Sequence, residues 1–223
     1  MNKKAFWDTC LVIAFVFHIN SLHYRSYDVF NSYDQHFWSN FVKKEYQRRY
    51  AEKFKNLLTF FNELNIELES PSKEFYTPFD LIQFAMKKYS DKLQDDAKNS
   101  VEPFWSEYIG IQSQVSFHNL KNNVDSCLTD LYIDTASNDN IIRNNLQLTP
   151  KRTNDYTNIN MLLESQGVTK EDRHVALDAY DFALKSSDPI DFITFDKVLY
   201  SGANNSKMTC FNSIKGKKDF KAS

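Results

Sequence analysis

The sequence predicts an α/β fold, with a mainly parallel sheet of about four to five strands flanked by helices and an extra helical region. Three observations support this class. Short apolar runs typical of buried strands stand near both ends, at residues 4–8 and 191–196, and each ends on a carboxylate. Helical patterns fill most of the chain between them. The 223 residues are 42% hydrophobic, enough to bury a substantial core. We expect one domain, 1–223, in which 71–168 is a mostly helical elaboration.

After the strand at 4–8, Thr9 is expected to cap a helix that runs through Phe17. This helix is apolar on nearly every side, as expected for an element buried between a sheet and its neighbours. Together with Met1–Lys4, the apolar run also resembles a secretory signal. However, Asp8 interrupts the pattern, and the run is far shorter than the ~20 residues that a membrane span needs. We therefore expect neither export nor a membrane contact.

The middle of the chain is predicted to be helical, after a short extended piece at 27–30. A helical pattern runs from 33 to 64 with no Gly or Pro to stop it. Residues 66–69 then alternate in polarity, which predicts a brief strand. Further helices are expected near 78–95 and 103–133.

The C-terminal third returns to strands. Thr169 and Asp172 predict the start of a helix that continues to Lys185, and the strand at 191–196 follows. Residues 208–214 alternate and are expected to form an edge strand. Five lysines lie between 207 and 221. They are the best local basic candidate for nucleic-acid contact, although we favour a solvated polar tail.

Composition excludes several classes of protein. The formal net charge is −2, so no global basic balance points to nucleic acid and no acidic tail points to a basic partner. Any nucleic-acid contact must be local. The three cysteines have neither close spacing nor paired histidines, which argues against a disulfide framework and a structural zinc site. A reducing, cytoplasmic setting fits this pattern.

Two carboxylates follow the predicted strands. In open α/β sheets, ligands bind beyond the carboxyl ends of the strands, where Asp8 and Asp196 stand. On neighbouring strands, which lie about 4.8 Å apart, the two charges repel unless a cation neutralises them. A set of oxygen ligands without His or Cys suits Mg²⁺ or Mn²⁺ rather than zinc. The pattern therefore predicts a divalent-metal site.

Asp172 is a third candidate, because it opens the helix that leads to the second strand and shares a face with Val175 and Ala179. That face is expected to pack on the sheet. The alternative is a helix cap, since Thr169 with Asp172 resembles a capping box. The two interpretations are compatible. Asp178 and Asp181, on the opposite face of the helix, are interpreted as ordinary surface charge.

Glu45 is a fourth candidate. It extends an apolar stripe of Trp38, Phe41 and Val42 with a carboxylate, and a buried carboxylate needs a partner. The alternative is a border position, with Glu45 paired to Arg48 or Arg49.

Together these segments resemble the PIN-domain nucleases. The resemblance covers about a third of the chain, in matching order, and is carried by the following: Asp8-Thr9 after a strand, Glu45 in a helix, Asp172-Arg173-His174-Val175-Ala176, and Phe192-Ile193-Thr194-Phe195-Asp196-Lys197. The chain is longer than compact members of this family. We attribute the excess to the helical region before residue 170.

The resemblance implies a parallel sheet with helices on both sides and a metal-dependent nuclease that cuts RNA or structured DNA. It makes Asp8, Glu45, Asp172 and Asp196 the ligands of Mg²⁺ or Mn²⁺, with Thr194 as a supporting hydroxyl. His174 is interpreted as a surface residue. The resemblance is also compatible with a homodimer and with an inhibitory protein partner.

Two other classes of function remain open from the sequence. The first is a non-catalytic scaffold whose helical region binds a protein partner. The aromatic segment 101–108 could be its docking surface, although aromatic side chains at helical spacing are usually core. The second is a membrane-associated protein anchored by its first helix.

Overall fold

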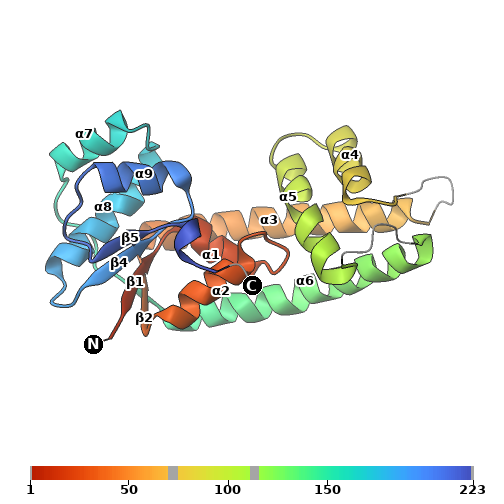
Figure 1. Ribbon diagram of the computed structural model, residues 1–223, viewed down its shortest axis with the longest axis horizontal. Helices are drawn as coiled ribbons and strands as arrows, with labels where there is room; N and C mark the ends of the chain where they lie inside the picture. The colour runs from red at the N-terminus through yellow and green to blue at the C-terminus, as the bar shows by residue number, and fades with distance from the viewer. Residues whose placement is uncertain (1, 70–74, 111–115, 222–223) are drawn as a thin grey trace. The chain divides into compact units, whose positions relative to one another are not determined.

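A computed structural model describes residues 2–69, 75–110 and 116–221, and within them a five-stranded sheet is formed (Figure 1). The strand order is β3-β2-β1-β4-β5, and all four pairings are parallel. The strands are β1 (Lys4–Trp7), β2 (Gln35–Trp38), β3 (Leu146–Leu148), β4 (Ile190–Ile193) and β5 (Ser213–Lys215). The predicted fold class is confirmed. In a parallel sheet, all carboxyl ends lie at one edge.

The register aligns the ends of the strands. Trp7 pairs with Ile193, which in turn pairs with Lys215. On the other side, Trp38 pairs with Leu148. The residues that follow the five strands therefore start from the same edge of the sheet. We call this the carboxyl edge.

Helices cover both faces of the sheet. Neighbouring residues in a strand point to opposite faces. The Phe6 ring contacts Phe182 of α8, with centroids 6.5 Å apart, whereas the Trp7 ring contacts Phe15 of α1 and Phe30 of α2. The segments between β1 and β2, between β3 and β4, between β4 and β5, and after β5 are helical. They are α1 (Thr9–Val16), α2 (His23–Ser32), α7 (Thr157–Ser165), α8 (Lys170–Lys185), α9 (Lys197–Asn205) and a 3-10 turn, η1 (Lys217–Asp219).

The chain divides into two compact units. The sheet unit comprises Met1–Phe15, Tyr24–Gln47 and Asn140–Ser223, and the helical unit comprises Val16–His23 and Arg48–Asp139. Helix α3 (Asn40–Glu67) and helix α6 (Phe117–Asn145) each contribute residues to both.

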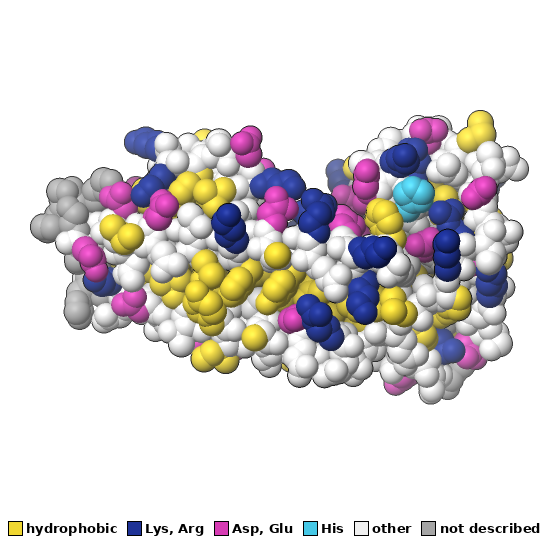
Figure 2. All heavy atoms as spheres, turned by 180° about the vertical axis from the view of Figure 1, so that it is seen from behind, with side chains coloured by type: hydrophobic (Ala, Val, Ile, Leu, Met, Phe, Trp, Pro, Cys, Tyr) yellow, Lys and Arg dark blue, Asp and Glu magenta, His cyan; other side chains and the backbone are white. Residues whose placement is uncertain are grey.

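The helical unit also holds α4 (Pro78–Lys88) and α5 (Asp91–Tyr108). Its core is aromatic: the Phe61 and Phe104 ring centroids are 5.2 Å apart, and both side chains are fully buried. Segment 101–108 therefore supplies core, because Val101 is also fully buried and Trp105 only 6% exposed. Of the two interpretations considered for this segment, docking surface or core, the burial supports the core. Hydrophobic side chains are instead exposed elsewhere on the helical unit (Figure 2), among them Phe79, Met86, Tyr132 and Ile133.

Several predicted elements differ in the structure. The expected extended piece at 27–30 lies inside α2, and the helix expected from residue 33 is preceded by strand β2. The strand expected at 66–69 is the end of α3 and a turn. Strand β3 lies within the region 71–168, which was expected to be mostly helical and for which no strand was predicted.

The C-terminal segment is not a solvated tail. It contains β5 and η1, and the Phe220 side chain is only 7% exposed. The Phe220 ring contacts Phe195, with centroids 6.3 Å apart. The backbone that carries its lysines is therefore ordered, while most of the lysine side chains remain exposed. Across the described part of the chain, no helix has the length and apolar character to cross a bilayer.

Candidate active site at the carboxyl edge of the sheet

Asp8 stands where the central strand ends. Its backbone N–H donates to the Ile193 carbonyl at 3.2 Å, which extends the pairing of β1 and β4 by one residue. The side chain is 3% exposed and accepts three hydrogen bonds. Oδ1 accepts from the Thr9 N–H at 2.6 Å, and Oδ2 accepts from the Thr194 hydroxyl at 2.7 Å and the Cys10 thiol at 2.8 Å. A single carboxylate thus connects both strands.

The surroundings of Asp8 disfavour the charged form of its carboxyl. Burial raises the pKa of this carboxyl from 3.8 to about 6, against the lowering effect of the hydrogen bonds from Cys10 and Thr194. The negative charge of Asp172 adds to the rise. Burial, followed by the charge of Asp8, also raises the pKa of the Cys10 thiol above its usual 9.0. Cys10 therefore stays protonated at neutral pH and acts as a donor.

Thr194 and Asp196 lie in the connection from β4 to α9. The strand predicted to reach Asp196 ends at Ile193. The Thr194 side chain is fully buried, and its hydroxyl also accepts the Asp196 N–H at 3.1 Å. Asp196 is the N-cap of α9, because its Oδ1 accepts the Leu199 N–H at 2.7 Å. The cap fixes Asp196 beside the end of β4.

Glu45 approaches the same edge from α3. Its Oε2 accepts the Thr9 hydroxyl at 2.7 Å. Because the Thr9 N–H already binds Asp8, a single residue connects the two carboxylates. This contact places Glu45 with the predicted site residues.

Asp172 takes part in the helix cap that was considered for it. The Thr169 hydroxyl donates to Oδ2 of Asp172 at 2.6 Å and accepts the Asp172 N–H at 3.2 Å, so Thr169 caps α8. Burial raises the pKa of the Asp172 carboxyl, and the charges of Asp196 and Glu45 raise it further. Asp172 is therefore within electrostatic reach of the other three acids.

We call Asp8, Glu45, Asp172 and Asp196 the acidic cluster. Their donor chemistry fits Mg²⁺ or Mn²⁺, because all four are carboxylates and their mutual repulsion favours a cation. Each is hydrogen bonded to neighbouring groups in the structure. Within the described residues, no three acidic, histidine or cysteine side chains are arranged to hold one ion.

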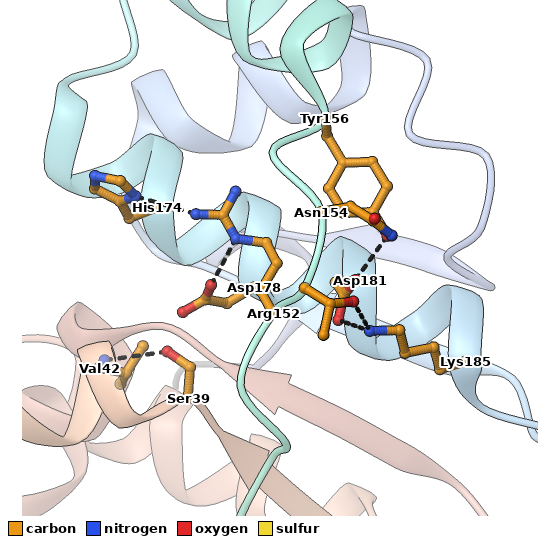
Figure 3. A network of polar contacts seen from close by, with 10 residues as sticks. Ser39, Val42, Arg152, Asn154, Tyr156, His174, Asp178, Asp181 and Lys185 are labelled. Atoms are coloured by element: carbon orange, nitrogen blue, oxygen red, sulfur yellow. Dashed lines mark hydrogen bonds and ion pairs between the residues drawn. The ribbon is translucent and has the colours of Figure 1, made fainter.

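The interpretation of Asp181 as surface charge is wrong. Its side chain is buried at 2% exposure, and it accepts from the Tyr156 hydroxyl at 2.7 Å and from the Lys185 amine at 2.6 Å (Figure 3). Asp178 also has a partner, Arg152, at 3.1 Å. The connection before α7 covers this face of α8, which helical periodicity alone could not show.

A cavity of about 430 Å³ opens beside Thr194 and Asp196. We call it the Asp196 cavity. Four cationic side chains and two aromatic ones line it: Arg25, Lys197, Lys217, Lys218, Phe195 and Tyr200. The Arg25 guanidinium donates to the Lys217 carbonyl at 2.8 Å, which ties α2 to the C-terminal segment.

Sequence reasoning did not identify Cys10, Arg25 or Tyr200 as parts of this site. The position of Cys10, two residues after Asp8, could have indicated that it belongs to the site. Nothing in the sequence around Arg25 and Tyr200 indicates this, because only the fold brings them to the cavity. Comparisons of the chain with protein-family models, with curated proteins and with solved structures find no match.

Proposed function

We propose that this protein is a metal-dependent nuclease, with RNA as its main substrate, that hydrolyses phosphodiester bonds at the acidic cluster. One observation carries the proposal. The buried carboxylate of Asp8, at the end of the central strand, is coupled to Asp172 and lies on the same edge as a cavity rich in cations. Carboxylates for a metal and cations for phosphates are the two charge types that such a reaction needs.

Asp8, Glu45, Asp172 and Asp196 would hold Mg²⁺ or Mn²⁺. When bound, the ion supplies Lewis-acid stabilisation of charge on the phosphate and lowers the pKa of a water molecule. Thr194 positions Asp8 through its 2.7 Å hydrogen bond. The cations of the Asp196 cavity would bind the phosphates of the substrate.

The PIN-like part of the proposal rests on the order of the motifs and on the parallel sheet with helices on both faces, which the resemblance implies. We also propose a cytoplasmic setting, which agrees with the free thiols of Cys10, Cys127 and Cys210.

Cleavage of labelled RNA in Mn²⁺ or Mg²⁺ tests the proposal. Asp8→Asn combined with Asp196→Asn should abolish cutting, because two ligands lose their charge while the side chains keep their shape. Asp155→Asn combined with Asp188→Asn removes the same charge from exposed acids of the sheet unit and should cut as the parent does. EDTA should stop both active proteins. Equal cleavage by the Asp8/Asp196 variant and the parent would contradict the assignment.

A second candidate function is a scaffold that binds a protein partner, as an inhibitor or as a second copy of this chain. The exposed apolar side chains of the helical unit favour it (Figure 2), because such patches mark interaction surfaces. If the parent cuts neither RNA nor DNA flaps in either metal, this function replaces the nuclease. Size-exclusion chromatography of the parent and of Phe79→Ser with Ile133→Ser would then test self-association.

A further inference from the structure

A second basic cleft lies at the carboxyl edge, on the other side of Asp8. It has a volume of about 330 Å³ and is formed by the residues that follow β2 and β3, together with α3 and α8. We call it the Arg152 cleft. The residues that matter here are Lys44, Thr149, Lys151, Arg152, His174 and Asp178. All belong to the sheet unit.

Arg152 is held in place within this cleft. Its Nε donates to Oδ1 of Asp178 at 3.1 Å, and its Nη2 lies 3.3 Å from Nδ1 of His174 (Figure 3). A guanidinium has donors only, so His174 Nδ1 is the acceptor of this pair. Among the described residues, Nη1 of Arg152 has no hydrogen bond or ion pair. A fixed guanidinium with a free donor suits a phosphate oxygen.

The balance of charge in the cleft is positive. Lys44 and Lys151 are exposed and add to Arg152, whereas Asp178 is the only carboxylate that lines the described cleft. Such a site attracts an anion rather than a metal ion.

Thr149 gives an independent sign of a ligand. Thr149 lines the cleft and is only 8% exposed, and its buried hydroxyl has no hydrogen-bond partner among the described residues. A buried hydroxyl without a partner is unfavourable, because it has lost its water and gained no bond in exchange. If the hydroxyl turns toward the cleft, a phosphate oxygen there would supply the missing partner.

The strand order places Asp8 between the two basic sites. The Arg152 cleft follows β3 and β2, Asp8 follows β1, and the Asp196 cavity follows β4 and β5. Three strand spacings of about 4.8 Å separate the two sites along the sheet, or about 14 Å. Lys44 also adjoins Glu45 in sequence, and His174 follows Asp172 by two residues. A chain of phosphates that touches both sites would pass the acidic cluster.

We infer that the Arg152 cleft binds a phosphodiester group of a single-stranded nucleic acid that runs across Asp8 from the Asp196 cavity. This inference rests on the proposed function and specifies its substrate class. Aromatic side chains line both sites, with Phe195 and Tyr200 at one and Phe41 at the other. Cations combined with aromatic surfaces bind single strands, whose bases are free to stack. The bases of a duplex are already stacked on one another.

Binding measured without metal tests the inference. Fluorescence anisotropy in EDTA would compare oligoribonucleotides of about 12 and about 3 nucleotides, the first within and the second below common single-strand site sizes of about 4–16 nucleotides. Lys44→Ala with Lys151→Ala should weaken binding of the long strand about tenfold and lower its salt slope by up to about 1.4. The short strand should bind unchanged, because the Asp196 cavity alone can hold it.

The matched control is Lys3→Ala with Lys207→Asn. These two lysines precede strands β1 and β5, so they lie away from the carboxyl edge. Asn suits position 207, where φ is 54°. This control should bind the long strand as the parent does. Equal weakening in both double variants, or no weakening in either, would overturn the inference. So would a duplex of the same sequence that binds as tightly as the single strand.

Thr149→Val separates a ligand role from a structural one. Valine has a similar shape and removes the buried hydroxyl, so the variant should unfold at the same or a higher temperature than the parent. It should nevertheless bind the long strand several-fold more weakly. Lower thermal stability with unchanged affinity would show that the hydroxyl serves the fold instead.

These assays distinguish the two proposals. If the parent binds the long strand through the Arg152 cleft but cuts nothing in Mg²⁺ or Mn²⁺, the nuclease assignment fails and the cleft stands. If the parent cuts RNA and the Lys44/Lys151 variant binds and cuts equally well, the cleft fails and the nuclease assignment stands.

Discussion

Asp8 is buried with a charge that the metal-free fold disfavours. The pKa of its carboxyl is about 6 in the folded protein and 3.8 in its ordinary state. Because the folded value is higher, the stability linked to this group is fully present below pH 3.8 and is lost as the pH rises through 6. A divalent ion at the acidic cluster would offset that loss.

We therefore predict that Asp8→Asn stabilises the metal-free protein at pH 7 by at most about 3 kcal/mol, because the amide no longer accepts both the Thr194 and the Cys10 hydrogen bonds. An asparagine keeps the acceptor for the Thr9 N–H and carries no charge. The gain over the parent should shrink between pH 6.5 and pH 4. Urea unfolding in EDTA at several pH values measures it, with Asp155→Asn, at an exposed position, as the control. A pH-independent difference, or a loss of stability at pH 7, would contradict the prediction.

At the scale of single residues, the sequence was informative where a residue adjoins a strand or helix end. Asp8, Thr194 and Asp172 have local signals, and the structure places them at the carboxyl edge. Arg152 and Thr149 have none. Their position at the carboxyl edge follows from the pairing of β3 with β2, which only three residue pairs define.

At the scale of elements, α9 is positioned by close contact with the connection between α7 and α8. A Cβ atom added at Gly202 would lie 2.3 Å from Cγ2 of Val168. Helix α9 also carries the cap residue Asp196 and contacts α8 and β5. Any displacement of this helix is therefore transmitted to the acidic cluster.

Gly202→Ala should destabilise the protein by about 1–3 kcal/mol, because the packed Val168 side chain must move. Ser201→Ala, at an exposed position of the same helix, should change stability by less than about 0.5 kcal/mol. Chemical denaturation of the two variants gives the comparison. Equal stabilities of both variants and the parent would show that α9 adjusts freely.

The elements that sequence reasoning found are those with strong local patterns. Helix α8 begins and ends within one residue of the expected bounds, and β1 and β4 are short, mostly apolar and buried, as is typical of parallel strands. Strand β2 was missed because its four residues continue a helical pattern. Strand β3, with three residues, is defined by its backbone pairing rather than by its own sequence.

At the scale of the whole molecule, the net charge of −2 hides how charge is distributed. The strand order collects acids from β1, β4, α3 and α8 at one place. The same order gathers cations on both sides of that place, after β3 and β5. Neither arrangement is visible in the composition, because the residues concerned come from segments that are far apart in the sequence.

Divalent-metal binding should therefore stabilise the whole chain. An ion that binds only the folded state at 100 times its Kd adds about 2.7 kcal/mol to the free energy of unfolding. We expect the melting temperature of the parent to rise with Mn²⁺ concentration and that of the Asp8→Asn/Asp196→Asn variant to stay nearly constant. The Asp155→Asn/Asp188→Asn control should respond as the parent does. A similar rise in all three proteins would place the bound ion outside the acidic cluster, whatever the outcome of the cleavage assay.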